Sequence, residues 1–280
     1  MTEFKHIAGA YSTYNRLGSW KDVTYGLIYT CNAGWLDLGH LDPYNDRPEI
    51  GAANLWAAVK NEGSPISHLY CAFNSARNFA SYYKGRESDR LYIQDRKNRE
   101  PYFRFSDGQR GYEVRYRQDH ETYPGKPGFE RSFIIKFGLT PDQQKSVALA
   151  IFMNVSFGME NFQSSFPWNS FTDSGFSQED LVSNLIGFYI AVGEVTKEEA
   201  IRLAHPVSRA TAEAIWNQQG AVGSNKNRTF HPQFLEGSAQ TVLGDECAGQ
   251  PKQFPAQFQR IKPAQEGQWY QSMAPGPTFI

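Results

Sequence analysis

One carboxylate, Glu160, stands in a stretch of the sequence that is unusually rich in aromatic residues. The rings closest to it in the sequence are Phe157, Phe162, Phe166 and Trp168. Glu160 falls in the last turn of a helix that the sequence predicts from about residue 141, and the partial negative charge of a helix C-terminus disfavours a carboxylate. Aromatic neighbours disfavour the charged form further because they exclude water. Both effects raise the pKa of Glu160, and a carboxyl that is protonated near neutral pH can act as a general acid.

Two further acids, Glu179 and Asp180, follow at the predicted start of the next helix, where the ionised form is favoured. One protonated and one ionised carboxyl form the pattern of acid/base hydrolysis, including cleavage of glycosidic bonds. The alternative is structural: Glu160 caps a loop, and Asp180 completes a capping box that begins at Ser177. On the first interpretation, Glu160 and Asp180 are candidate catalytic residues.

A second group of polar residues lies within residues 29–46, among apolar neighbours. Cys31 and His40 are the residue types of a thiol nucleophile and its base, although they are nine positions apart and a buried cysteine is usually inert. Asp37 precedes His40 by three positions, so one helical turn would place both on one face and let the carboxylate orient the imidazole. A histidine that is merely hydrogen-bonded near the core is the alternative interpretation.

Four more residues are candidates for substrate binding. Trp35 and Trp168 would offer ring faces for sugar stacking. Ser183 and Asn184 are polar positions on an otherwise apolar predicted helix, and they could hydrogen-bond across to the loop that follows Glu160. Hydrogen bonds to the backbone are the structural alternative for both.

The sequence shows no complete set of metal ligands. It lacks the HExxH motif and any CxxC pair, and its remaining histidines are scattered. Zinc would need His40, Glu160 and another acid brought together by folding, so no cofactor is predicted. The cysteines are odd in number and widely spaced, which does not predict a disulfide scaffold. They are Cys31, Cys71 and Cys247.

The composition is that of a globular protein with neither a nucleic-acid nor a membrane signature. Hydrophobic residues make up 40% and charged residues 20% of the 280 residues, enough for a sizeable core. The formal net charge of −1 and the absence of a long Lys/Arg block give no reason to expect nucleic acid as a partner. No apolar run approaches the roughly 18 residues of a membrane span. The N-terminus lacks the basic start and apolar run of a Sec signal, so we expect synthesis in the cytoplasm without Sec export.

The elements that position these residues alternate between helical and strand periodicity. Apolar spacing predicts helices over residues 50–63 and 73–85. Residues 91–137 then contain short runs with alternating apolar positions, which predict antiparallel strands, and Asp107-Gly108 predicts a hairpin turn between two of them. The polar positions of one run are expected to form the solvated face of the sheet. These positions are Glu113, Arg115 and Arg117.

Helix start signals return in the second half of the chain. Capping patterns predict helices that begin near Thr140, Ser177 and Thr196, and a further helix ends near Gly220. The predicted fold class is α+β: a small antiparallel sheet packed by helices from both the N- and C-terminal parts. We expect a single domain over residues 1–220, followed over residues 221–280 by a long irregular wrap or tail that is docked by Trp269 and Tyr270.

Two segments resemble the motifs of a bacterial family described only as domain of unknown function 4056. Residues 30–40 read TCNAGWLDLGH, and residues 175–187 read GFSQEDLVSNLIG after a glutamate that ends a helix. The similarity spans roughly residues 25 to 190. Some members carry His immediately before that glutamate, where this chain has Met159, and this departure weakens a metal site built on a His-Glu pair. The family has no assigned reaction, so the resemblance groups the residues without defining their chemistry.

Together these features predict a hydrolase of a bacterial cell-envelope polymer, with peptidoglycan as the leading substrate and peptide or glycan as its chemical class. Glu160 would be the general acid, with His40 and Asp37 as base or orienter. Without a Sec signal, export would fall to a contractile injection system, and a secretion apparatus or an immunity protein would be the partner. Two alternatives stay open: a cysteine- or metal-dependent amide or ester hydrolase that uses Cys31 and His40, and a non-enzymatic structural or binding module of a secretion or phage-like particle.

Overall fold

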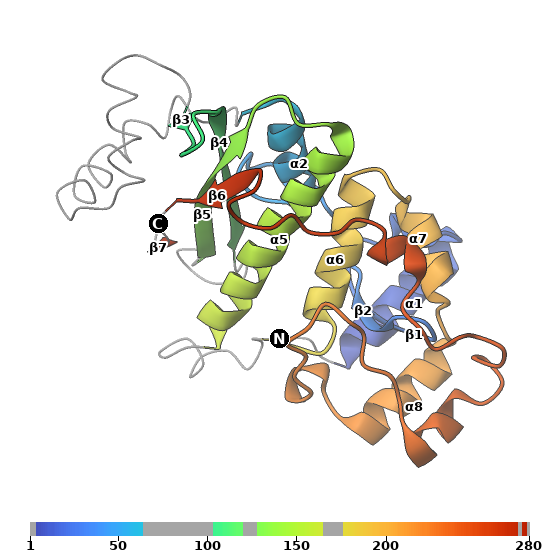
Figure 1. Ribbon diagram of the computed structural model, residues 1–280. Coiled ribbons are helices and arrows are strands. Elements are labelled where there is room, and N and C mark those ends of the chain that lie inside the picture. Colours follow the sequence, from blue (N-terminus) through green and yellow to red (C-terminus); the bar gives the residue numbers. More distant parts are fainter. Residues whose placement is uncertain (1–3, 64–102, 120–127, 165–175, 274–275, 279–280) are drawn as a thin grey trace. The chain divides into compact units, whose positions relative to one another are not determined.

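The computed structural model describes residues 4–63, 103–119, 128–164, 176–273 and 276–278 (Figure 1). Two small antiparallel sheets and several helices make the fold α+β, as predicted. The chain forms two compact units. The first unit comprises residues 1–43 and 156–260, and the second comprises residues 44–155 and 261–280. The sequence predicted a single domain over residues 1–220, and residues 221–260 belong to the first unit.

The first unit is built around a β-hairpin that helices cover. Its strands are β1 (Leu27–Thr30) and β2 (Gly34–Asp37), paired antiparallel. Its helices are α1 (Lys5–Leu17), α6 (Asp180–Ala191), α7 (Lys197–Ala204) and α8 (Arg209–Gln219), with the short 3-10 helices η1 (Trp20–Asp22), η3 (Val222–Ser224), η4 (Gly237–Leu243) and η5 (Ala256–Gln259). Helices α1 and α8 contact β1, while α6 contacts β2. Neither the hairpin nor α1 was predicted from the sequence.

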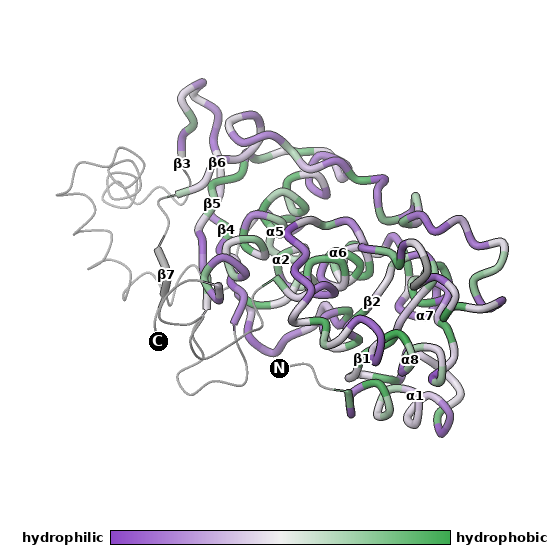
Figure 2. Tube along the Cα trace, turned by 90° about the horizontal axis from the view of Figure 1, so that it is seen from below, coloured by the Kyte–Doolittle hydropathy of each residue, from purple (hydrophilic) through white to green (hydrophobic). Residues whose placement is uncertain are grey.

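Helix α6 is the buried centre of the first unit, and most of its residues are apolar (Figure 2). Gly187 lets this helix approach the chain that follows β2. A Cβ atom at Gly187 would lie 2.7 Å from the carbonyl oxygen of His40, a distance that side chains do not tolerate. The glycine therefore allows α6 and the turn at His40 to meet closely.

The predicted capping signals are largely confirmed. The Thr196 side chain accepts a hydrogen bond from the Glu199 N–H at the start of α7, and Ser208 does the same for Thr211 at the start of α8. Thr140 and Gln143 cap helix α5 (Pro141–Gln163) reciprocally. Helix α6 differs, because it begins at Asp180 and the residues from Phe176 to Glu179 form a turn instead of a first helical turn.

The second unit contains a five-stranded antiparallel sheet. Its strands are β3 (Phe103–Arg104), β4 (Arg110–Asp119), β5 (Gly128–Lys136), β6 (Tyr270–Ser272) and β7 (Gly276–Thr278), in the order β3-β4-β5-β6 with β7 also paired to β5. The hairpin predicted at Asp107-Gly108 joins β3 to β4. Helix α2 (Ala52–Lys60) contacts β4. Helix α5 begins in this unit, where Asn154 accepts a hydrogen bond of 2.6 Å from Arg131 of β5, and it continues into the first unit.

Two features of the second unit, the polar face of β4 and the C-terminal tail, differ from the sequence predictions. The polar face of β4 is not solvated: Arg115 and Arg117 are buried, and they pair with Glu113 and Asp119 on the same strand. Burial is tolerated because each guanidinium has a carboxylate partner. The tail is less irregular than expected, since Tyr270 is buried and lies on β6, in register with Ile135 of β5.

Other sequence predictions lie outside the described residues. They are the helix over residues 73–85 and the strand that begins at Leu91. In the part of the chain that the structure describes, no helix has the length and apolarity needed to cross a bilayer.

Candidate active site

Three of the predicted residues come together in the first unit. The Nδ1 atom of His40 lies 3.3 Å from the Oδ1 atom of Asp180. The charge of His40 also acts on Glu160, and the charge of Glu160 acts on Asp180. The side chain of His40 is 43% exposed, whereas that of Asp180 is 10% exposed. The fold therefore brings one solvent-accessible imidazole close to buried carboxyl groups.

Asp37 shapes the turn that carries His40. Its Oδ1 accepts the Gly39 N–H at 2.7 Å, and its carbonyl oxygen accepts the Leu41 N–H at 3.2 Å. The Asp37 N–H in turn donates to the Oγ atom of Ser183 at 2.9 Å, which ties the end of β2 to helix α6. Asp37 and His40 lie on one turn, as expected, but the acid that contacts the imidazole is Asp180. Asp37 and Ser183 thus support the site from behind.

Asp180 is the first residue of α6, and each of its carboxyl oxygens has a partner. Oδ1 faces His40, while Oδ2 accepts the Ser177 N–H at 3.1 Å, the half of the predicted capping box that is present. Burial raises the pKa of Asp180 well above its usual value, and the charges of Glu160, Glu179 and Asp37 raise it further, against the opposing hydrogen bond from Ser177. The sequence predicted that the helix N-terminus would favour an ionised Asp180, and burial and the surrounding acids oppose that effect.

Glu160 lies in the last turn of α5 with only 4% of its surface exposed. Burial raises its pKa to about 7, although the Phe176 N–H, His40 and Lys226 all oppose the rise. The Phe176 N–H donates to Glu160 Oε2 at 2.5 Å. The predicted direction of the shift is therefore confirmed, with burial as its main cause.

The aromatic residues around Glu160 take different positions. The Phe157 ring packs edge-on against Phe176, with 5.2 Å between the ring centroids, and Phe157 is 37% exposed. Phe162 is half-buried on α5. Phe166 and Trp168 lie outside the described residues. Of the rings near Glu160 that the structure describes, Phe176 is the one whose backbone contacts its carboxylate.

The other proposed substrate-binding residues are parts of the core or of its edge. Trp35 is buried on β2, where its ring packs edge-on against Tyr29 and Trp216. It has no exposed face on which a sugar could stack, so its predicted role is wrong. Ser183 is fully buried, and its hydroxyl oxygen accepts the Asp37 N–H. Asn184 is half-buried on α6.

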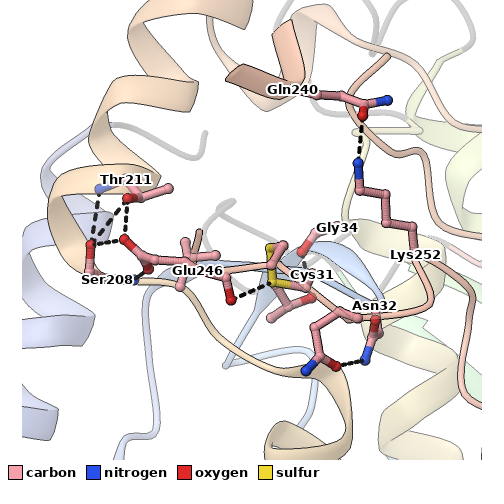
Figure 3. The surroundings of a disulfide bond; sticks show 12 residues. Cys31, Asn32, Gly34, Ser208, Thr211, Gln240, Glu246 and Lys252 are labelled. Atoms are coloured by element: carbon pink, nitrogen blue, oxygen red, sulfur yellow. Dashed lines mark hydrogen bonds between the residues drawn. A yellow bond between two sulfur atoms is a disulfide. The ribbon is translucent and has the colours of Figure 1, made fainter. Parts of the chain in front are cut away.

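Cys31 is joined to Cys247 by a disulfide that spans 216 positions of the sequence (Figure 3). The wide spacing of the cysteines in the sequence did not predict this bond. The bond corrects the candidate nucleophile, because a sulfur atom in a disulfide carries no thiolate. In the oxidised protein, the alternative in which Cys31 attacks a substrate is excluded.

The segment around Cys247 is held by two more sets of hydrogen bonds (Figure 3). The Glu246 carboxylate accepts the Ser208 N–H at 2.5 Å and the hydroxyl groups of Ser208 and Thr211 at 2.8 Å and 2.5 Å, at the start of α8. On the other side, Asn32 donates its amide to Gln250 at 3.1 Å. These contacts fasten the chain after α8 to the rest of the first unit.

Within the described ranges, no group of three His, Cys, Asp or Glu side chains has an arrangement that would hold a metal ion. The site is instead a cluster of acids with one imidazole and one nearby lysine. Sequence reasoning missed the contributions of Phe176 and Lys226. Phe176 contributes its backbone N–H, and Lys226 comes from a loop 66 positions after Glu160, so neither has a local sequence signal.

Comparisons with protein-family models, curated protein sequences and solved structures found no match for this chain. The resemblance of residues 30–40 and 175–187 to domain of unknown function 4056 stays a prediction from the motifs.

Proposed function

We propose that this protein is a hydrolase that uses Glu160 as general acid and the His40–Asp180 pair as general base. The observation that carries the proposal is the buried Glu160, with a pKa of about 7, in a cluster with an exposed imidazole that Asp180 contacts at 3.3 Å. A carboxyl with this pKa is partly protonated at neutral pH, as a proton donor must be.

The cluster divides the two proton-transfer roles. The charge of Glu160 raises the pKa of Asp180, so the two carboxyls cannot both be ionised without cost, and a proton on Glu160 favours an ionised Asp180. Ionised Asp180 then accepts the Nδ1–H of His40. This leaves Nε2 free of a proton, ready to take one from a water molecule as that water attacks the substrate.

The leaving group would receive its proton from Glu160. Oε2 of Glu160 already accepts the Phe176 N–H, so the transferable proton belongs on Oε1. After the reaction, Glu160 is ionised and His40 is protonated, and the two opposite charges stabilise each other until solvent resets both. A water molecule is consumed, and the scissile bond is replaced by one new hydroxyl and one protonated leaving group.

We propose a bacterial cell-envelope polymer as the substrate, and peptidoglycan is the leading candidate. The disulfide between Cys31 and Cys247 supports this choice, because such bonds persist in oxidising compartments, where the envelope polymer also lies. It supports export of the protein for the same reason. The combination of a carboxylic acid and a base serves glycosidic and amide bonds alike, so the products must identify the bond.

The test is the incubation of purified protein with isolated peptidoglycan, followed by mass spectrometry of the released fragments. We expect soluble fragments from the wild type and at least a hundredfold slower release from Glu160→Gln, since general acid catalysis typically contributes about 10²–10⁴-fold. Glu213→Gln is the matched control, because Glu213 pairs with Arg209 on the exposed face of α8. Intact polymer with the wild type, or full activity of a folded Glu160→Gln, would contradict the proposal.

A further inference from the structure

The turn that precedes α6 holds one residue in an unfavourable backbone conformation. Phe176 has φ +58°, in the left-handed region that residues other than glycine rarely adopt. Its side chain is fully buried, and its N–H donates to Glu160 Oε2 at 2.5 Å. Such a conformation persists only when neighbouring contacts enforce it.

Asn227 provides these contacts from the chain that follows α8. Its backbone N–H donates to the Phe176 carbonyl oxygen at 2.9 Å, and its side-chain amide donates to the carbonyl oxygens of Gln178 at 3.3 Å and His231 at 2.9 Å. The Oδ1 atom of Asn227 accepts the Thr229 N–H at 3.0 Å and the Thr229 hydroxyl at 2.9 Å. Asn227 is 2% exposed. Its backbone N–H therefore holds the Phe176 end of the strained turn, and its buried side-chain amide holds the Gln178 end.

Other contacts from the chain after α8 also hold the Phe176 turn. Ser177 forms an isolated antiparallel bridge with Lys226, and the Gln178 N–H donates to the Val222 carbonyl oxygen at 3.2 Å. The Arg228 guanidinium lies 4.4 Å from the centroid of the Phe176 ring. Among these residues, Asn227 is the buried one whose side chain bonds to the turn itself.

We propose that Asn227 is a positioning residue that fixes the Phe176 turn so that its N–H points at Glu160. The catalytic consequence rests on the proposed hydrolase function, but the effect on the protonation of Glu160 does not need a substrate. Without the Asn227 side chain, the amide bond to the Gln178 carbonyl oxygen is lost. Phe176 can then relax to a negative φ, and its N–H turns away from the carboxylate.

The consequence for Glu160 has a definite sign. A hydrogen bond from the Phe176 N–H favours the ionised carboxylate, so its loss raises the pKa of Glu160. The charged groups that act on Glu160 and Asp180 come from three elements, and an Asn227 substitution removes none of them. They are Asp37 and His40 at the end of β2, Glu179 and Asp180 at the start of α6, and Lys226 on the chain after α8.

The experiment is a carboxyl ¹³C NMR titration of the full chain labelled at glutamate, with the Glu160 signal assigned by its loss in Glu160→Gln. We expect the midpoint of Glu160 to rise by about one pH unit in Asn227→Ala, because a hydrogen bond to a charged group contributes about that much. Asn225→Ala is the matched control, since Asn225 bonds to the Gln219 carbonyl oxygen and not to the turn. The Glu160 midpoint in Asn225→Ala should equal the Glu160 midpoint in the wild type.

A folded Asn227→Ala with an unchanged Glu160 midpoint would overturn the proposal. If that variant does not fold, Thr229→Val removes the hydroxyl that donates to Asn227 and that also bonds to the backbone of His231. This variant should give a smaller rise, and no rise there would overturn the proposal equally. With an active enzyme, the alkaline limb of the pH profile should move upward by the same interval. A shifted midpoint in a protein that cuts no polymer would uphold the positioning role and reject the hydrolase.

Discussion

Two glutamates of the first unit show how differently the same contact can act. Glu160 and Glu246 each accept one backbone N–H at 2.5 Å, from Phe176 and Ser208 respectively. Burial raises the pKa of Glu160 to about 7. Partial burial also acts to raise the pKa of Glu246, but hydrogen bonds from Thr211 and Ser208 outweigh it, and the pKa lies below its usual value.

The difference lies in what surrounds each carboxylate. Glu246 is exposed and receives two hydroxyl donors at the N-terminus of α8, where negative charge is favoured. Glu160 has a backbone donor in the Phe176 N–H and almost no exposure to solvent, and its charge acts on a second carboxyl, Asp180. The arrangement around Glu246 anchors a segment of the chain, whereas the arrangement around Glu160 favours the protonated carboxyl. The comparison shows that burial and the charges of neighbours decide the role of an acid here.

The largest effect should come from the covalent bond beside Glu246. The disulfide between Cys31 and Cys247 closes a loop of 216 positions, and such a cross-link restricts the unfolded chain by roughly 5 kcal/mol. Urea unfolding of the double variant Cys31→Ala, Cys247→Ala should show a loss of free energy of unfolding that approaches this value. Addition of a dithiol reductant should weaken the wild type but not the variant. Equal midpoints for the oxidised wild type and the double variant would mean that the hydrogen bonds of Glu246 and Asn32 hold the segment unaided.

A smaller effect should follow from the proton on Glu160. Its pKa lies at about 7 in the folded protein against an ordinary value of 4.5. As the pH rises from about 4.5 to 7, the unfolded chain loses this proton while the folded chain keeps it, so the free energy of unfolding falls. The fall amounts to at most about 3 kcal/mol. Glu160→Gln should remove most of this decline in urea titrations between pH 5 and pH 8, and parallel curves for variant and wild type would contradict the assignment.

The smallest effect should come from Glu246, with the opposite sign. Because its folded pKa is depressed, its stabilisation is present above the unfolded pKa and is lost as the pH falls through the folded one. Glu246→Gln should lower the free energy of unfolding at pH 7 by about 1 kcal/mol, the usual contribution of a helix cap, with solvent screening at this exposed site. Thermal unfolding at pH 7 and pH 3 checks the sign. A larger loss at pH 3 than at pH 7 would reverse the comparison.

The parts that were predictable from the sequence have local causes. Thr140, Thr196 and the glycine at 220 mark helix ends within a few residues, and the structure follows them. The raised pKa of Glu160 was predictable in direction because the apolar sequence around it implies burial. Capping and apolar periodicity act over one or two helical turns, which is why they could be recognised without the fold.

The parts that were missed depend on contacts between distant segments. Asp180 was expected to be ionised because its helix N-terminus is local. Its pKa is raised by burial and by the charges of Glu160 and Asp37, which come from elsewhere in the chain. The partner of Cys31 stands 216 positions away. Trp35 was predicted to stack against a sugar, but whether a ring lies on the surface or in the core depends on how the whole unit packs.

The proposed role of Glu160 is tested most directly by titration of its carboxyl group in the wild-type protein, followed by ¹³C NMR. We expect a midpoint near 7, because burial outweighs the hydrogen bond and the positive charges that favour ionisation. A midpoint near 4.5, the ordinary value of a glutamate, would show that Glu160 is ionised at neutral pH and cannot supply the proton on which the proposed reaction depends.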